Sequence, residues 1–231
     1  MMCREQGMKE GGSMTITRLG ETKKGRFSVF ADGEFLFSVH KDIFLSRKEL
    51  ELGREVSVEL LEEIRLEDEA YSCKEKALTL LEYSAHSAGR LAEKLRRFYP
   101  PETVDITIER LGELGLLDDL DYGRRLAADL LNLRGYSLGR VRQALYQRRL
   151  DRETIEQVME ELEDIDQVGP IVALVKKKYL SKLRECKGRQ KVAAALQRRG
   201  YGYDEIRVAL AQVLEELPED EEEDGLTYDS E

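Results

Sequence analysis

The sequence contains no tryptophan, only three cysteines and no long run of apolar residues. Cys3, Cys73 and Cys186 lie far apart and show no paired spacing, which argues against a disulfide framework and favours a reducing compartment. No apolar stretch approaches the roughly 18 residues that a membrane-spanning helix needs. Residues 1–13 hold charges and glycines rather than a hydrophobic block, so they are unlike a secretory signal. We therefore expect a cytoplasmic protein with no membrane partner.

Histidine, the side chain that most often serves in acid–base catalysis, is also scarce. His40 and His86 are the only histidines, and neither has a Cys, His or carboxylate at metal-ligand spacing. The sequence has no nucleophile elbow and no Gly-x-x-x-x-Gly-Lys phosphate loop. Its best carboxylate cluster, Asp118, Asp119 and Asp121, is typical of a helix start, although a paired-carboxylate catalytic site is the alternative. We expect no catalytic residue, no metal and no cofactor, and hence no enzyme.

Only four prolines occur, all at or beyond position 100, so long helices are not interrupted before that point. Charged residues make up 36% of the chain, against roughly 25% in an average domain. A chain with so many charged residues has few apolar side chains to fill one deep hydrophobic core. It favours helices that each bury one stripe and expose the rest to water.

The net charge of −10 comes from the C-terminal end of the chain. Residues 215–231 hold ten acidic and no basic side chains, which leaves 37 of the 47 acidic residues to face 37 basic ones elsewhere. We predict that residues 218–231 form a disordered, solubilising acidic tail. The alternative is that this tail folds back on basic helices as an internal mimic of an anionic ligand.

Residues 14–56 are expected to form a small β-rich unit, preceded by a disordered terminus, residues 1–13. Asp32-Gly33 separates two runs of alternating apolar residues, and such a pair favours a tight hairpin because both turn positions need a positive φ. The pattern predicts three strands within Thr15–His40 and one helical turn at Lys41–Leu45.

From Ser57 onward the sequence predicts only helices. Ser57 is expected to cap a helix that runs from Val58 to about Glu82. Three stretches then repeat at about fifty residues. The middle helix of each is expected at Ser87–Phe98, Ser137–Arg149 and Lys187–Arg199, where Leu95, Leu145 and Leu196 recur at offsets of 50 and 51.

Each repeat also has a leading and a following helix. The leading helices are predicted at Lys74–Glu82, Leu120–Leu133 and Pro170–Leu183, and the following helices carry Val104, Ile155 and Ile206 at constant 51-residue offsets. We place the repeats at 57–117 (with a linking helix), 118–165 and 166–217. Because one module has a small core, neighbouring modules should stack. The expected fold is mainly α, with tandem three-helix repeats in an elongated, curved array behind a small N-terminal unit that contains a β-hairpin.

Positive charge concentrates in the middle helices. Asn132–Leu150 and Lys187–Gly200 each hold five basic residues and no acidic one. Such stripes fit phosphates or an acidic protein surface, although a plain solvated face is the alternative. A basic middle helix also resembles, weakly, the helix-turn-helix DNA readers. The predicted partner-binding residues are Arg90, Lys94, Arg97, Arg140, Arg142, Arg148, Arg149, Lys191, Arg198 and Arg199.

Several motifs resemble the RecX family. They are Gly-Leu-Leu-Asp-Asp-x-x-Tyr at 115–122, Arg-Val-Arg-Gln-Ala-Leu at 140–145, and Leu-Gln-Arg-Arg-Gly-Tyr at 196–201. The β-rich start is similar to the extension of longer members, and the resemblance spans about Thr15 to Leu217. The sequence departs from the family pattern at Arg149, where a glycine is usual, and at Gly123, where an alanine is usual.

The resemblance implies a function. RecX proteins bind along the RecA–DNA filament and inhibit or reshape its activity, so we expect a monomer whose partners are that filament and, more weakly, single- or double-stranded DNA. Two other functions stay open. One is a stand-alone DNA-binding protein that uses helix-turn-helix-like modules, and the other is a generic helical adaptor.

Overall fold

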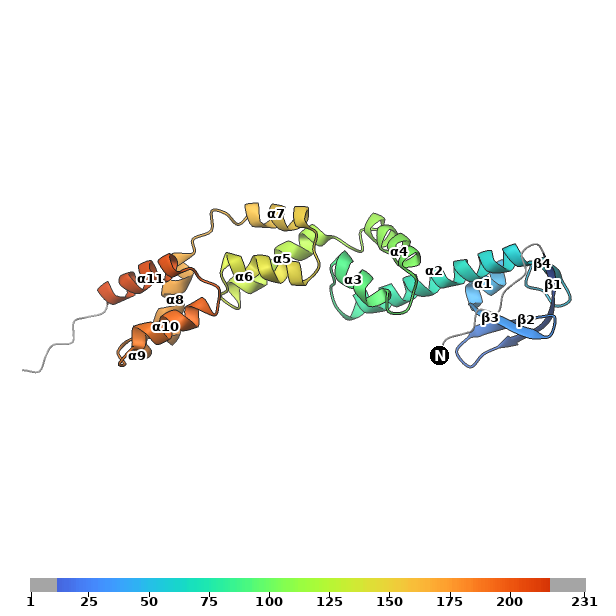
Figure 1. Ribbon diagram of the computed structural model, residues 1–231, viewed down its shortest axis with the longest axis horizontal. Coiled ribbons are helices and arrows are strands. Elements are labelled where there is room, and N and C mark those ends of the chain that lie inside the picture. Colours follow the sequence, from blue (N-terminus) through green and yellow to red (C-terminus); the bar gives the residue numbers. More distant parts are fainter. Residues whose placement is uncertain (1–11, 217–231) are drawn as a thin grey trace, which may run out of the picture. The chain divides into compact units, whose positions relative to one another are not determined.

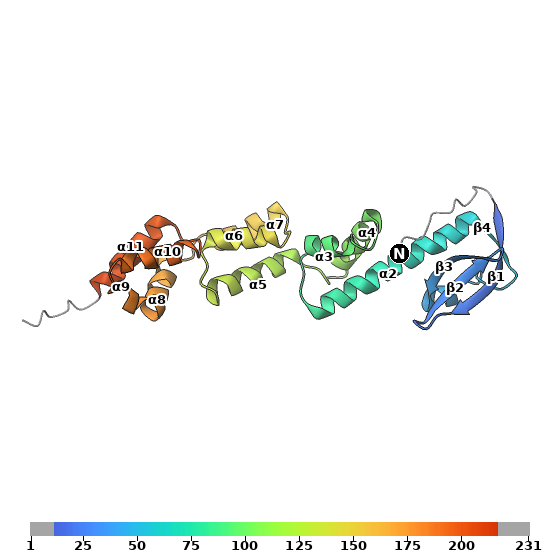
Figure 2. The same ribbon diagram turned by 60° about the horizontal axis from the view of Figure 1, so that its bottom comes forward.

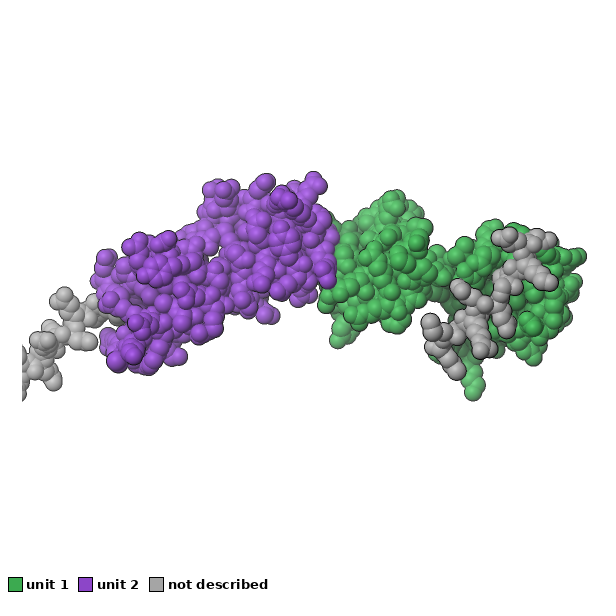
Figure 3. Space-filling model, viewed as in Figure 1, with its two compact units in different colours: residues 1–118 green, residues 119–231 purple. Residues whose placement is uncertain are grey.

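The computed structural model describes residues 12–216, which divide into two compact units (Figure 3). The first unit ends at Asp118 and the second begins at Asp119. Most of the predicted disordered terminus and the whole of the predicted acidic tail therefore lie outside the described residues. Ser13, which we had assigned to the terminus, instead begins the first strand.

The N-terminal part of the first unit is a four-stranded antiparallel sheet. Its strands are β1 (Ser13–Glu21), β2 (Arg26–Ala31), β3 (Glu34–His40) and β4 (Glu55–Ser57), in the order β3-β2-β1-β4. Asp32 and Gly33 have φ values of 50° and 87°, which confirms the predicted hairpin between β2 and β3. The three strands predicted within Thr15–His40 are confirmed as β1, β2 and β3. Strand β4 was not predicted, because its three residues are too few for an alternating pattern to be visible in the sequence.

Two helices cover this sheet. The short α1 (Lys41–Ser46) confirms the predicted helical turn, and α2 (Val58–Tyr83) is a single long helix whose start is capped by Ser57. Arg26 on β2 forms an ion pair with Asp68 on α2, and the Asp68 carboxylate also accepts a hydrogen bond from His40 N (2.6 Å). These contacts fix the sheet against the first half of α2.

The second half of α2 belongs to the first three-helix repeat. It packs with α3 (Ala88–Leu95) and α4 (Pro101–Glu113), and Figure 2 shows α2 running from beside the sheet to these two helices. Leu61 and Ile64 of α2 lie in the core under the sheet, whereas Cys73 and Ala77 lie in the core of the repeat. One helix therefore serves two cores and joins them into one unit.

The second unit contains the other two repeats. Helices α5 (Asp119–Asn132), α6 (Leu138–Gln147) and α7 (Arg152–Glu160) enclose one core. The third repeat is built from α8 (Val168–Lys178), α9 (Leu180–Leu183), α10 (Gly188–Gln197) and α11 (Tyr203–Glu215) around another. The expected leading helix at Pro170–Leu183 is thus two helices, because the backbone leaves helical geometry at Tyr179 (φ −125°, ψ 4°).

The repeat spacing of the sequence is confirmed by burial. The three residues at each equivalent core position are almost fully buried in all three repeats: Leu91, Val141 and Val192; Leu95, Leu145 and Leu196; Val104, Ile155 and Ile206. The middle helices are shorter than predicted. Ser87 and Ser137 are N-caps rather than first helical residues, and each helix ends two or three residues before its predicted C-terminal end. The fold class, three-helix repeats behind a small β-rich unit, is as expected.

Candidate binding surface

The turn after α10 contacts the N-cap of α6, where the second and third repeats meet (Figure 1). The buried Ser137 hydroxyl caps α6 by accepting a hydrogen bond from Arg140 N (3.3 Å), and it donates to the carbonyl oxygen of Gly200 (2.6 Å). Ser137 N also donates to the carbonyl oxygen of Arg199 (3.2 Å). A single serine therefore starts a helix and joins two repeats. We call this contact the junction.

Gly200 makes the junction possible. Its φ is 89°, in the left-handed region that favours glycine. A Cβ atom at this position would lie 2.6 Å from Ser137 Oγ and 3.0 Å from Arg140 Cβ. The two repeats approach each other so closely that no other residue fits here without movement.

Arg199 also belongs to the junction. Its guanidinium donates hydrogen bonds to the carbonyl oxygens of Arg134 and Gly135, the latter at 3.4 Å. We had predicted Arg199 as a partner-binding residue, and the structure gives its side chain an intramolecular role that helps to fix the repeats. The neighbouring Arg198 is exposed.

Several arginines around the junction carry charge that no carboxylate neutralises. Arg140, Arg142 and Arg198 are exposed, and within residues 12–216 none of the three has a carboxylate partner. The Arg140 guanidinium lies over the ring of Tyr136, 5.0 Å from its centroid. A hydrogen bond with Arg134, assisted by the charge of Arg140, lowers the pKa of Tyr136. The junction thus has a positive local field.

Arg148 and Arg149 follow at the end of α6. Arg148 donates a hydrogen bond to the Tyr122 hydroxyl (3.4 Å). Arg149 has a φ of 62° and precedes the buried Leu150, just as Gly200 precedes the buried Tyr201. A side chain in this conformation costs about 1–2 kcal/mol relative to glycine. The chain therefore holds an exposed arginine where the backbone itself favours glycine.

One of the three cations on the predicted basic face of the first repeat is neutralised. Arg90 binds Glu93 (2.7 Å), and Lys94 Nζ lies 3.0 Å from His86 Nε2. Arg97 is exposed and has no carboxylate partner among the described residues. The structure thus places all three side chains at the surface region expected from their spacing. Among the described residues, a carboxylate compensates the charge of Arg90 but not those of Lys94 and Arg97.

The third repeat carries a basic region that sequence reasoning largely missed. Residues 176–191, which we call the basic segment, contain eight basic side chains and one acidic one, Glu185. The predicted contact residue Lys191 binds Glu185 (2.9 Å), and this hydrogen bond lowers the pKa of Glu185. The signal that was overlooked is the run of three lysines at 176–178, which ends α8.

The residues considered for catalysis have structural roles. Asp119 and Asp121 lie in the first turn of α5, and Asp121 forms an ion pair with Arg125 one turn later. His40 caps α1 by accepting a hydrogen bond from Asp42 N (3.3 Å). Residues 12–216 contain no group of three or more side chains suited to hold a metal ion. Over the same range, no helix is long and apolar enough to cross a membrane.

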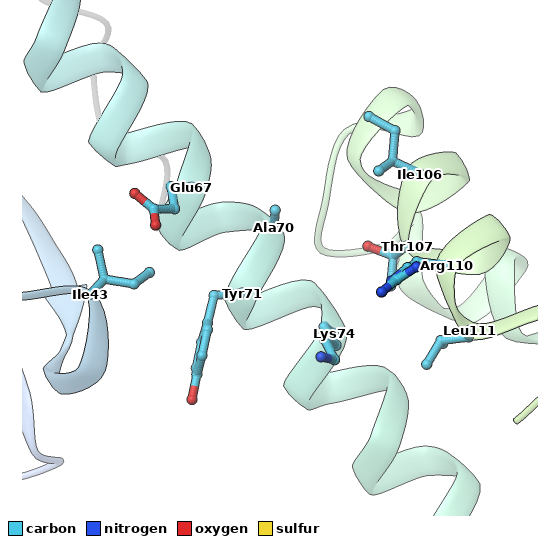
Figure 4. Close-up of a pocket in the computed structure, with 9 residues that line it drawn as sticks. All are labelled: Ile43, Glu67, Ala70, Tyr71, Lys74, Ile106, Thr107, Arg110 and Leu111. Atoms are coloured by element: carbon cyan, nitrogen blue, oxygen red, sulfur yellow. The ribbon is translucent and has the colours of Figure 1, made fainter. Parts of the chain in front are cut away.

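A groove of about 270 Å³ opens between α2 and α4 in the first unit, with Ile43 of α1 at its edge (Figure 4). Its surface is mainly apolar, with Ile106 and Leu111 contributed by α4. The carboxylate at its rim, Glu67, already binds Arg47 (2.6 Å). This composition suits an apolar ligand better than acid–base chemistry, and the groove shares no residue with the junction.

Comparisons with known proteins give a consistent result. The family model described as "RecX, first three-helix domain" matches residues 73–111, and "RecX, second three-helix domain" matches residues 118–159. A protein named "Regulatory protein RecX" from Clostridioides difficile (strain 630) is 28% identical over 86% of this chain and 95% of that protein. The protein of the same name from Bacillus subtilis (strain 168) is 28% identical over 94% of this chain and 83% of its own length.

Solved structures agree on the fold. A crystal structure of regulatory protein RecX superimposes with a TM-score of 0.63 and 21% identity, and covers 86% of this chain and 99% of that chain. RecX from Lactobacillus salivarius superimposes with a TM-score of 0.57 and 20% identity over 63% of this chain and 97% of its own.

Proposed function

This chain belongs to the RecX family, and we propose that it binds RecA–DNA filaments and modulates recombinase activity, in the direction of inhibition. The shared name of its relatives supports a regulatory role. We propose no catalytic step, since Asp121 pairs with Arg125 and Asp119 lies with it in the first turn of α5, as expected for acids at a helix start. The protein would act as a monomer in the cytoplasm.

One observation carries this proposal: exposed arginines that have no carboxylate partner among residues 12–216 lie near a fixed contact between two repeats. Guanidinium groups bind carboxylates and phosphates with two parallel hydrogen bonds, so they suit a surface made of protein and DNA. Arg140 and Arg142 project from α6, whose start is fixed by Ser137 and Gly200. The repeats thus offer a filament, itself a repeating structure, several linked contacts. Each contact raises the effective concentration for the next.

The test is recombinase ATP hydrolysis on single-stranded DNA, titrated with this protein at sub-stoichiometric ratios. We expect the rate to fall, and to fall less with Arg142→Glu combined with Arg149→Glu. The matched control is Arg125→Glu with Arg152→Glu, which makes the same charge change at two other exposed sites of the same unit, where Arg125 pairs with Asp121 and Arg152 with Glu156. The control should inhibit like the wild type. An unchanged rate with the wild-type protein would contradict the proposal.

The same unpartnered arginines also favour the second candidate, a stand-alone DNA-binding protein. The third repeat adds to this, since residues 168–216 hold 11 basic and 5 acidic side chains, a net charge of +6. This candidate predicts tight binding to bare DNA with a steep salt dependence and no need for recombinase. Tighter binding to filaments than to bare DNA would favour the first candidate.

A further inference from the structure

The third repeat and the segment that follows it have opposite charges. Residues 168–216 have a net charge of +6, whereas residues 217–231 hold eight acidic and no basic side chains. The preceding parts of the described chain match less well as a whole, because residues 12–118 and 119–167 carry net charges of −5 and −3. Within them, residues 132–150 are locally basic, with five basic side chains against eight in residues 176–191. Charge complementarity therefore directs the terminal segment to the third repeat.

The point where the described chain ends lies beside the basic segment. Glu216 forms an ion pair with Lys176 in the last turn of α8. Lys177 and Lys178 follow directly, and both are exposed and have no carboxylate partner within residues 12–216. The terminal segment thus starts next to cations that are available for pairing.

The chain length fits the same surface. An extended chain spans at most about 3.6 Å per residue, so Glu219 reaches about 10 Å from Glu216 and Asp224 about 28 Å. Residues 219–224 are six consecutive acids. The basic segment covers the end of α8, the short α9 and the start of α10, and these elements are in contact. Six carboxylates can therefore follow it without moving any helix.

Single exposed ion pairs would not hold such a segment, because each contributes only about 0.2–1 kcal/mol. Several pairs formed by a tethered chain behave differently, since the tether keeps the local concentration of carboxylates in the millimolar range. Weak contacts can then be occupied most of the time at low ionic strength, and they weaken as salt is added.

We propose that residues 217–231 dock on the basic segment, residues 176–191, as an internal polyanion. Docked there, they cover a stretch with eight basic side chains and one acidic one, and they compete with any external polyanion for the third repeat. The docking of residues 217–231 does not depend on the proposed function, whereas competition with a nucleoprotein filament rests on it.

Cys186 offers a direct test of the docking, because it is exposed and lies within the basic segment. Cys73 is buried, which raises the pKa of its thiol and protects it, and Cys3→Ser removes the third thiol. With a paramagnetic label on Cys186, we expect NMR signals of residues 217–231 to broaden at low salt. The broadening should disappear in about 0.5 M salt, where the Debye length falls to a few ångströms.

Two variants complete this test. Lys177→Glu with Lys178→Glu should abolish the broadening, and so should replacement of the acids at 219–224 by Asn and Gln, which keeps the tail length. Broadening that is as strong in these variants as in the parent protein would overturn the proposal, as would signals in the parent that stay sharp at low salt.

Competition is tested separately with a fluorescent single-stranded oligonucleotide. A chain ending at Glu216 and the chain with the neutralised tail should both bind it about 3- to 10-fold more tightly than the full chain at low salt, a gain of about 0.7–1.4 kcal/mol. Equal affinities would refute competition even if the label detects docking. This assay needs no recombinase, so its outcome and a failed ATP hydrolysis test remain distinguishable.

Discussion

The first and second repeats place a basic residue at the same helical position but give it different surroundings. Arg90 and Arg140 each lie one residue before a core position, Leu91 or Val141, that is fully buried. Three residues later the first repeat has Glu93, which binds Arg90 (2.7 Å), whereas the second has Gln143. One side chain therefore decides whether the repeat presents a neutral pair or a free cation.

The third repeat shows the same principle with another partner. Lys191 is the equivalent residue, and Ala194 takes the place of Glu93. The lysine binds Glu185 instead, which comes from the turn before α10. The spacing of the buried core residues thus determines where each basic side chain lies. Whether a nearby carboxylate pairs with it determines whether its charge is left for another molecule. Four substitutions test this comparison, from the largest expected effect to the smallest.

Gly200→Ala should separate the second and third repeats. The left-handed backbone and the close approach of Ser137 and Arg140 together should cost about 2–4 kcal/mol. The free energy of unfolding from urea denaturation measures this loss. Gly139→Ala is the control, since its Cβ would meet nothing closer than 3.8 Å and it lies in α6, where alanine is favoured. Equal effects of the two substitutions would mean that the junction contributes no stability.

Ser137→Ala removes both a helix cap and the hydrogen bond to Gly200. We expect a loss of about 2 kcal/mol in the free energy of unfolding, against about 1 kcal/mol for Ser57→Ala. Ser57 is the matched serine because it caps α2 through Leu60 N (3.2 Å). If Ser137→Ala costs no more than Ser57→Ala, the bond between the repeats adds nothing.

Gln143→Glu should convert the second repeat into a copy of the first. The new carboxylate would pair with Arg140 at the i,i+3 spacing, and binding to the filament should weaken about 2- to 3-fold. Glu93→Gln is the converse change, which frees Arg90 and should strengthen binding by a similar factor. Titration at two salt concentrations measures both. Identical affinities for the two variants would show that this pairing does not separate the repeats.

The following helices differ in their response to acid. Asp151 caps α7, and hydrogen bonds from Thr154 N and the Thr154 hydroxyl lower its pKa below the usual 3.8. Its stabilising contribution is complete above that value and is lost as the pH falls through the lower, folded pKa. Asp151→Asn keeps the cap without a titrating group, so it should lose slightly less stability than the wild type between about pH 5 and pH 3.

Thermal unfolding at the two pH values measures this difference. Other acidic residues, such as Glu161 and Glu185, are present in both proteins, so their contributions to the pH dependence of stability cancel in the comparison. The first repeat has Pro100 at the equivalent position and no side-chain hydrogen bond at that cap, so its following helix should lack this pH response. Parallel pH profiles for the two proteins would show that the cap carboxylate does not contribute.

Much of the fold could be predicted because the signals are local. The Asp32-Gly33 hairpin, the Ser57 cap and the apolar spacing of fifty residues each follow from backbone conformation or helix periodicity, and the structure confirms them. The two features that sequence reasoning missed left no local signal. Strand β4 is too short to show a pattern, and the break at Tyr179 has no proline or glycine to mark it.

The candidate surface was predicted in part. Sequence spacing identified the cations of α3 and α6, but it did not show that Arg90 is neutralised by Glu93 or that Arg199 holds two repeats together. The basic segment was missed because its charges belong to three short elements rather than to one helical face. No single-helix pattern reveals a surface of that kind.

By itself, then, the sequence determined the three-helix repeats, the small hairpin unit and the positions of the basic residues, because helix period, caps and turn residues act over a few neighbours. The tertiary structure alone decided which cations are free, how α2 serves two cores and how Gly200 and Ser137 join the second repeat to the third. Those features depend on atoms that lie as far as 65 residues apart in the chain and meet only once the helices pack.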